Sequence, residues 1–234
     1  MATEFLYESS MQQRDIYRTK GIVDRIVVSG THGTGKTTLC KALHVMLSQP
    51  DIMAACGEYQ YFEEPIREMR DIGFPINQYA NDVTQLAMAT EHAMNATYDR
   101  YIADRCIVDV YAYAKYLSEL PKPMVSEACV KFLEKQVYRF IYNFHGVALV
   151  PVANASDDIE KDDVRDTDVE FRNGVNSIIV RTWIALLKPE VEFDNTGRHG
   201  LLFLLPDGFS KRLKHAMGII APDFYFNEDW YKYV

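Results

Sequence analysis

The stretch Gly30-Thr31-His32-Gly33-Thr34-Gly35-Lys36-Thr37 decides the fold of this chain. It fits the pattern G-x-x-x-x-G-K-[ST], in which a glycine-rich loop cradles the phosphates of a nucleotide. The surroundings fit as well, because the loop follows the apolar run Ile26-Val27-Val28 and continues into a helical pattern at Thr38-Leu39-Cys40-Lys41-Ala42-Leu43. A strand, a glycine-rich loop and a helix in this order form the context that the pattern requires.

Each residue type in the loop has a chemical reason. The glycines Gly30, Gly33 and Gly35 let backbone N–H groups turn towards an anion, and the N-terminus of the next helix points at the same phosphate. Lys36 can reach the β- and γ-phosphates, and the Thr37 hydroxyl can ligate Mg²⁺. We therefore expect residues 30–38 to bind ATP and Mg²⁺. The alternative is a glycine-rich turn that carries a lysine by chance.

Length and composition are those of a globular protein with a sizeable core. The chain has 234 residues, of which 48% are hydrophobic and 25% charged, and this fits one domain with modest additions. We expect an N-terminal extension at 1–21 and a domain at 22–234. The net charge of −8 argues against a broad surface for duplex DNA, because nonspecific DNA affinity comes from cationic contacts to phosphate. It leaves room for a local basic pocket that binds one nucleotide.

The predicted location is the cytoplasm, or the host cytoplasm if the chain is viral. The four cysteines are widely spaced and form no C-x-x-C pair, so we interpret them as reduced packing residues of a cytosolic protein. The N-terminus lacks a basic stretch followed by an apolar one, and no run approaches about 18 apolar residues. We expect neither a signal peptide nor a membrane span.

Apolar runs and helical spacings alternate along the chain. Strands are predicted at 22–29, 57–62, 101–103 and 147–152, with a fifth at 191–193 and an extra one at 201–205. Helices are predicted at 36–48, 66–71, 77–99, 110–117, 126–144, 175–187 and 210–217. The alternation implies right-handed β-α-β units. It predicts an α/β fold whose parallel sheet of about five strands is flanked by helices.

Two further polar motifs follow predicted strands. Glu63-Glu64-Pro65 comes after the second strand, and Asp104-Arg105 comes after the third. The carboxyl ends of parallel strands form the rim at which open α/β sheets bind ligands. Together with the loop, these motifs supply what phosphoryl transfer needs: a nucleotide cradle, a group that positions the acceptor, and charge near the moving phosphoryl group.

In this order and spacing the motifs resemble the thymidylate kinase and deoxynucleoside kinase superfamily, and nicotinamide-riboside-kinase-like P-loop kinases of the AAA type. The resemblance also includes Asp109-x-Tyr111-Ala112-Tyr113 and an arginine-bearing polar segment after the fourth strand, and it covers about residues 22–197. It implies the P-loop NTPase fold with a lid, placed at about 153–175. An aromatic C-terminal tail lies beyond the shared core.

The resemblance implies roles for several of the matching residues. Glu64, or Glu63 beside it, would contact and deprotonate the acceptor hydroxyl. Asp104 would lie near Mg²⁺ together with Thr37, and Arg105 would face the substrate phosphate or the transferring group. The alternatives are purely structural: the glutamate would cap the next helix, and Asp104 and Arg105 would form a structural ion pair at the strand end.

Two polar residues interrupt the apolar positions of the predicted helix 77–99. Gln85 matches the glutamine that hydrogen-bonds the base in deoxynucleoside kinases, since an amide offers both a donor and an acceptor. A solvated helix face is the alternative. We interpret His92 as a helix histidine whose hydrogen bonds are satisfied.

The predicted lid contains Lys161, Arg165 and Arg172. Arg165 and Arg172 are seven positions apart and share a face on a helix, so a closing lid could bring either over the phosphates as an arginine finger. The interleaved aspartates allow a salt-bridged surface segment instead. Asn195 falls where related kinases contact adenine, or it is part of a turn.

We therefore expect an ATP-dependent kinase whose acceptor is a nucleoside or nucleotide, first of all a deoxynucleoside monophosphate or deoxynucleoside of thymidylate type. One alternative acceptor is hydroxymethyluracil within DNA, as in thymidylate-kinase-like phage enzymes. That acceptor would suit a phage-encoded chain, although the acidic charge disfavours DNA. Another alternative is an acceptor-independent ATPase or nucleotide switch that binds a protein partner and needs neither Glu64-Pro65 nor Arg105. A homodimer is also compatible with the sequence.

Overall fold

Five parallel strands form the sheet at the centre of the molecule, in the order β2-β3-β1-β4-β5. The computed structural model describes residues 23–144, 146–151, 168–187 and 201–221. The strands are β1 Arg25–Val28, β2 Gln60–Phe62, β3 Tyr101–Asp104, β4 Val147–Pro151 and β5 Leu201–Leu205. The predicted fold class, an α/β fold with a five-stranded parallel sheet flanked by helices, is confirmed. The strand at 201–205, predicted as an extra one, is the edge strand β5.

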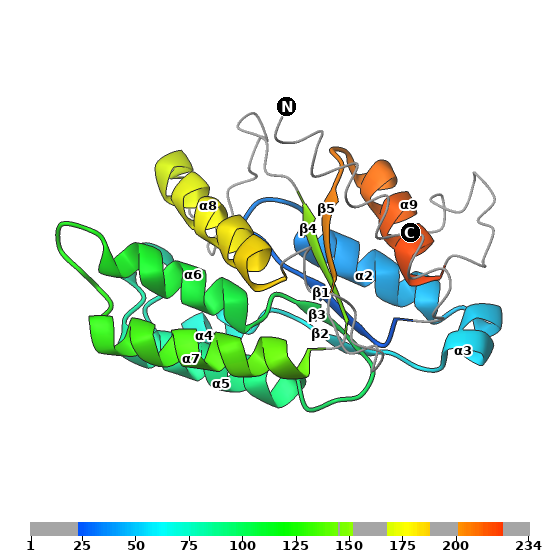
Figure 1. The fold of residues 1–234 in the computed structure, drawn as a ribbon, viewed down its shortest axis with the longest axis horizontal. Coiled ribbons are helices and arrows are strands. Elements are labelled where there is room, and N and C mark those ends of the chain that lie inside the picture. Colours follow the sequence, from blue (N-terminus) through cyan, green and yellow to red (C-terminus); the bar gives the residue numbers. More distant parts are fainter. Residues whose placement is uncertain (1–22, 145, 152–167, 188–200, 222–234) are drawn as a thin grey trace.

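Helices cover both faces of this sheet (Figure 1). One face carries α2 Lys36–Leu47, α3 Pro50–Cys56 and α9 Phe209–Ile220. The other carries α5 Asp82–Asn95, α6 Ile107–Ser118, α7 Glu127–Asn143 and α8 Val169–Leu186. The short helix α4 Ile66–Asp71 and the 3₁₀ turn η1 Asn77–Tyr79 connect β2 to α5.

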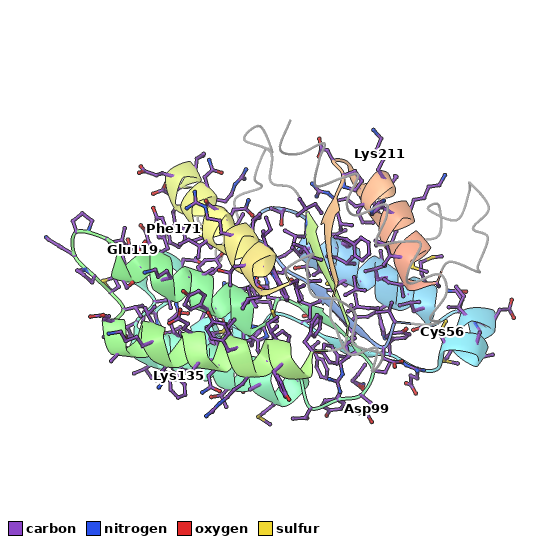
Figure 2. All side chains as sticks on the ribbon, viewed as in Figure 1. Cys56, Asp99, Glu119, Lys135, Phe171 and Lys211 are labelled. Carbon is purple, nitrogen blue, oxygen red and sulfur yellow. The ribbon has the colours of Figure 1, made fainter. Side chains whose placement is uncertain are left out.

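The central strands are apolar throughout because both of their faces are covered. Val27 of β1 and Val150 of β4 belong to the core beneath α5, α6, α7 and α8. Their chain neighbours Ile26 and Leu149 belong to the core beneath α2 and α9. Figure 2 shows side chains filling the layers between the sheet and the helices. The sheet is therefore a rigid platform between two apolar layers.

The register of the strands brings three loops to one edge. Val28, the last residue of β1, pairs with Asp104 of β3 on one side and Leu149 of β4 on the other. Phe62, the last residue of β2, pairs with Ala103 of β3. The glycine-rich loop, Glu63-Glu64 and Asp104-Arg105 consequently emerge side by side at the carboxyl edge of the sheet, as the sequence predicts.

Some helix boundaries differ from the prediction. The helix predicted at 36–48 ends at Leu47, and Pro50 begins a separate helix, α3, that was not predicted; proline's fixed φ favours this first position. The predicted helix at 77–99 is interrupted, because Asn81 caps a new helix by accepting a hydrogen bond from Thr84 N at 3.1 Å. Helix α8 begins at Val169, capped by Asp168, so the end of the predicted lid is helical.

Other predictions concern residues outside the described part. The strand at 191–193, most of the lid, the N-terminal extension and the aromatic tail lie there, as do Lys161, Arg165 and Asn195. All four cysteines are buried, as expected of packing residues. Among the described helices, none is long and apolar enough to span a membrane.

Candidate active site

The glycine-rich loop wraps around the N-terminus of α2. Gly33 and Gly35 have φ angles of 74° and 76°, a left-handed conformation that side chains with a Cβ rarely adopt. The buried Lys36 ammonium donates a hydrogen bond to Thr31 O at 2.6 Å, so it folds back over the loop. Burial lowers the pKa of Lys36 to about 8. An anion placed in the loop would favour the charged form again.

Thr37 and Asp104 meet beside the loop. Thr37 Oγ1 donates to Asp104 Oδ2 at 2.5 Å, and the second oxygen, Oδ1, is buried and makes no hydrogen bond to a described residue. A buried oxygen without a partner is unfavourable, whereas hydroxyl and carboxylate oxygens are ligands that Mg²⁺ prefers. The pair therefore fits Mg²⁺. In the described ranges, no group of three or more His, Cys, Asp or Glu side chains is arranged to hold a metal.

Glu64 and Arg105 form an ion pair with a distance of 2.7 Å between Oε1 and Nε. The guanidinium also lies over the ring of Tyr113, 4.9 Å from its centroid. Arg105 has a φ of 76°, a conformation that costs a non-glycine residue free energy and recurs at functional sites. Its backbone N–H donates to Val28 O at 3.0 Å, which holds the turn after β3 against β1.

The environment of this pair sets its charges. Burial raises the pKa of the Glu64 carboxyl, and the Arg105 cation opposes that rise. Burial also disfavours the Arg105 cation, but Glu64 and Tyr113 outweigh this effect and raise the pKa of Arg105. The site thus contains a permanent cation next to a carboxylate that is more basic than a free glutamate.

The structure distinguishes Glu64 from Glu63. The Glu64 side chain is 18% exposed and contacts Arg105, whereas the Glu63 side chain is 59% exposed and pairs with Lys41 at 2.8 Å. Among the described residues, no side chain caps α4, and neither Glu63 nor Glu64 is the capping carboxylate of the alternative. Of the two carboxylates, Glu64 is therefore the more buried one and the one that contacts Arg105.

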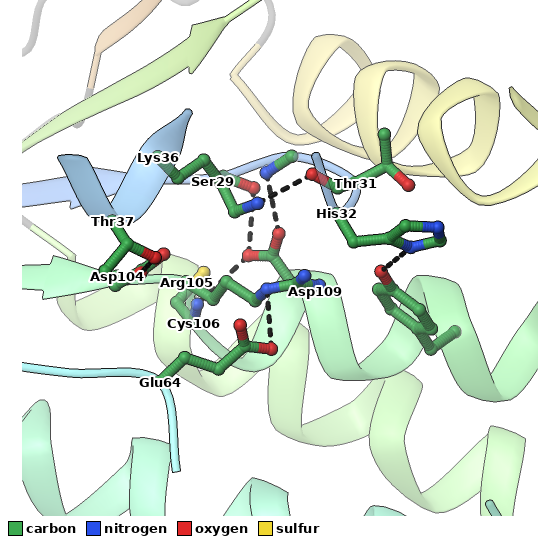
Figure 3. A network of polar contacts seen from close by, with 12 residues as sticks. Ser29, Thr31, His32, Lys36, Thr37, Glu64, Asp104, Arg105, Cys106 and Asp109 are labelled. Carbon is green, nitrogen blue, oxygen red and sulfur yellow. Dashed lines mark hydrogen bonds and ion pairs between the residues drawn. The ribbon is translucent and has the colours of Figure 1, made fainter. Parts of the chain in front are cut away.

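Asp109 connects the loop to β3 and α6 (Figure 3). Its Oδ1 accepts a hydrogen bond from Gly30 N at 2.8 Å, and its Oδ2 accepts from Ser29 Oγ at 2.9 Å and from Cys106 N at 3.0 Å. Trp183 Nε1 of α8 donates to the same Ser29 Oγ at 2.8 Å. No role was predicted for Asp109 from the sequence. It lies three residues after the N-cap Cys106, which is the spacing of a capping box.

An aromatic cluster links the loop to the start of α8. His32 Nδ1 lies 3.1 Å from the Tyr113 hydroxyl, and the imidazole stacks on Phe171 with centroids 5.8 Å apart. Phe171, labelled in Figure 2, also meets Tyr116 of α6 edge-on. The next residue, Arg172, is 1% exposed within α8 and does not line the cavity described below. The role of Arg172 as an arginine finger therefore stays a prediction.

Helix α9 supplies an arginine that the sequence analysis missed. Arg212 is buried, and its Nη1 donates to Thr34 O in the loop at 2.6 Å. Its Nε donates to Pro206 O at 2.9 Å, and its Nη2 lies 3.5 Å from Asp207. Arg212 thus fixes the outer side of the loop to the last described helix.

A cavity of about 430 Å³ joins these groups, a volume typical of small-molecule sites. The predicted residues that line it are His32, Gly33, Gly35, Lys36, Thr37, Thr38, Glu63, Glu64, Gln85, Asp104 and Arg105. Gly30, Thr31 and Thr34 lie in the loop behind this wall. The structure therefore unites the predicted donor and acceptor motifs in one site.

Helix α5 contributes to the wall of the cavity. Gln85 and His92 both line the cavity and are each 4% exposed, so the alternative of a solvated Gln85 is wrong. The interpretation of His92 as a satisfied histidine is also wrong, because its buried Nε2 has no hydrogen-bond partner among the described residues. Burial, assisted by the Arg105 cation, lowers the pKa of His92 to about 3. The imidazole is therefore neutral at physiological pH.

Comparison with known proteins defines the class to which the chain belongs. A family described as AAA domain matches residues 25–197. Because this match spans more than half of the chain, the protein belongs to that family. No curated protein sequence matches the chain.

Solved structures with the same fold include two kinases and the NadR protein. Deoxyadenosine kinase from M. mycoides, with the products dCMP and dCDP, has a TM-score of 0.58 at 13% identity, over 83% of this chain and 97% of that one. Thymidylate kinase from Ehrlichia chaffeensis has a TM-score of 0.51 at 14% identity, over 85% and 98%. The NadR protein in complex with NAD and AMP-PNP has a TM-score of 0.58 at 16% identity, over 94% of this chain but only 56% of NadR. The predicted resemblance to this superfamily is thus confirmed as a shared fold, while a phage origin stays a prediction.

Proposed function

We propose that the protein transfers the γ-phosphoryl group of ATP to a nucleoside or nucleotide. The observation that carries this proposal is that one cavity holds both the phosphate-binding loop and the buried Glu64–Arg105 pair. An ATPase can use a carboxylate and an arginine to position water and stabilise charge, but it has no need of a lined space for an acceptor beyond them. The enclosed space beyond the pair is lined by α5, which bears Gln85 and His92.

On the donor side, the loop amides and Lys36 would bind the phosphates. Thr37 and Asp104 would hold Mg²⁺, which would neutralise negative charge on the phosphates. Asp109 and Arg212 keep the loop in shape from either side. These residues bind and orient the donor without any covalent step of their own.

On the acceptor side, Glu64 would orient the acceptor hydroxyl and accept its proton. Its raised pKa suits this task, since a base whose pKa lies nearer the working pH transfers protons more effectively. Arg105 would stabilise the negative charge that develops during transfer. Arg165 and Arg172 remain proposed contributors from the lid, and Asn195 a proposed contact to adenine.

For the acceptor we propose a deoxynucleoside or its monophosphate, with the thymidylate type as the first to test. The structural neighbours include a deoxyadenosine kinase and a thymidylate kinase, which supports this class of acceptor. The polar side chain of Gln85 on the cavity wall supports it as well, because an amide can hydrogen-bond a base edge.

The test is ADP formation from MgATP with and without acceptors. The panel contains the deoxynucleosides, their 5′-monophosphates and a DNA oligonucleotide with hydroxymethyluracil, and phosphorylated product is identified by mass. We expect ADP to form in proportion to a phosphorylated nucleoside or nucleotide. ADP formation that is equal with and without every acceptor would establish the ATPase alternative instead. Stimulation by the oligonucleotide alone would establish the DNA alternative.

A further inference from the structure

His92 is a buried polar residue that the proposed transfer chemistry does not use. It lies on α5, lines the cavity, and presents a buried Nε2 that hydrogen-bonds to no described residue. Such a group is unfavourable in a folded protein unless a ligand or water completes it. In the same cavity, Asp104 Oδ1 also has no hydrogen-bond partner among the described residues, but a bound Mg²⁺ would satisfy it. His92 lies on the acceptor side and calls for a ligand of its own.

The surroundings of His92 restrict the kind of ligand. A neutral imidazole offers one N–H donor and one nitrogen acceptor and carries no charge for a phosphate. Met88, Ala80 and Val110 add apolar surface to the lining of the same cavity. A group that suits both conditions is a flat ring with an uncharged polar edge.

The spacing on α5 adds a second contact. Gln85, Met88 and His92 are separated by three and then four positions, so they share one face of the helix. Gln85 and His92 lie about 10 Å apart along the helix axis, with Met88 between them. A planar base that lies on Met88 can therefore present one edge to Gln85 and another to His92.

We propose that His92 is a specificity-determining residue, which hydrogen-bonds the base of the acceptor while Gln85 hydrogen-bonds another edge of the same base. This inference rests on the proposed function, because it requires an acceptor that carries a base. It goes beyond that function by naming the group that discriminates among bases.

The experiment measures kcat/KM for the four deoxynucleosides and their monophosphates. The variants are His92→Leu, which removes both hydrogen-bonding nitrogens, and His92→Asn, which keeps a donor and an acceptor on a shorter side chain. Glu91→Leu is the matched control, because Glu91 is exposed on the same helix. Melting temperatures and the KM for ATP are measured for each.

We expect His92→Leu to change the ratio of kcat/KM between the best and the next base by about tenfold, the usual effect of one lost hydrogen bond. This change should come from the KM for the acceptor, with the KM for ATP unaltered. His92→Asn should re-rank the bases, because its polar atoms lie elsewhere. Glu91→Leu should leave the ranking as in the wild type.

Two failures are distinguishable. If the wild type forms no phosphorylated product with any base-bearing acceptor, the proposed function fails and the role of His92 fails with it. If the wild type is active but both His92 variants keep its base ranking, the specificity role alone is overturned and His92 is a packing residue. Should His92→Leu not fold, the ranking measured with His92→Asn decides in the same way.

Discussion

Lys36 is a cation kept in a buried position, and this makes nucleotide binding sensitive to alkaline pH. With a pKa of about 8 in the free protein, the ammonium is present below that pH and is lost progressively above it. The Kd for ATP should therefore rise above pH 8, approaching tenfold per pH unit at most. Titration calorimetry between pH 7 and 9.5 measures this rise.

The control for this prediction is Lys36→Arg. A guanidinium stays protonated throughout this range, so the weaker binding that we expect from this variant should not vary with pH. A wild-type Kd that stays constant from pH 7 to 9.5 would show that the charge on Lys36 does not govern binding.

The two adjacent glutamates provide a matched pair of substitutions. Glu64→Gln removes the proposed base and should lower kcat by about 10²–10⁴-fold, the range of general base catalysis. ATP affinity should change little, since Glu64 lies on the acceptor side of the cavity. Glu63→Gln should lower kcat by only a few-fold, because Glu63 pairs with Lys41 at the surface. Steady-state rates of product formation measure both effects. An equal loss of activity in the two variants would refute the assignment of Glu64 as the base.

Helix α9 affects the site through one side chain. Arg212→Ala removes the hydrogen bond to Thr34 O and leaves that loop carbonyl without its donor. We expect the free energy of unfolding to fall by about 1–3 kcal/mol, the cost of a lost hydrogen bond to a charged group. The KM for ATP should rise several-fold because the loop is less well ordered. Chemical denaturation and initial rates measure the two effects.

Lys214 on the same helix is the control, because it is exposed. Lys214→Ala should change the free energy of unfolding by less than about 0.5 kcal/mol and leave the KM for ATP as it is. An equal KM for ATP in wild type and Arg212→Ala would mean that α9 contributes to packing but not to the loop.

The elements that the sequence predicts well are those whose signal is local. β1 and β4 are short apolar runs, and α2 follows directly from the loop motif. Predictions failed where one residue permits two structures. Proline is common both after the end of a helix and at the start of one, and Pro50 starts α3. Within the apolar pattern at 77–99, Asn77 begins a 3₁₀ turn and Asn81 caps the new helix α5. Local sequence does not decide between such options, because packing against the sheet does.

The residues of the site also fall into those with a local sequence signal and those that depend on packing. Lys36, Thr37, Glu64 and Arg105 were predictable because each occupies a fixed place in a motif or after a strand. Their supports were not, because those contacts join residues far apart in the chain: Asp109 with Gly30, Trp183 with Ser29, and Arg212 with Thr34. The burial of His92 likewise depends on how α5 packs against α6 and α7.

At the scale of the whole molecule, the site depends on elements beyond the matched family region. β5 and α9 follow residue 197 and supply Phe203, Leu205, Leu213 and Met217, all fully buried beside α2. Burial of each such side chain contributes about 1.5–3 kcal/mol. The contribution of the four together is comparable with the whole stability of a typical protein, about 5–15 kcal/mol. A chain that ends at residue 197 should therefore fail to fold.

Circular dichroism during heating tests this prediction. The shortened chain should show no cooperative transition, whereas a chain ending at residue 221, which keeps every described element, should melt cooperatively. A cooperative melt of the chain ending at residue 197 would show that the region 25–197 is stable by itself.

The four buried thiols have a practical consequence. Alkylating reagents attack the thiolate, and burial places Cys40 and Cys106 out of solvent while raising the pKa of both. Modification of the native protein must therefore wait for local opening. Since Cys40 lies on α2 behind the loop and Cys106 caps α6 next to Arg105, their alkylation kinetics report on the opening of the site itself. A cysteine introduced at the exposed Asp99 would react first and offers a selective attachment point for a fluorophore.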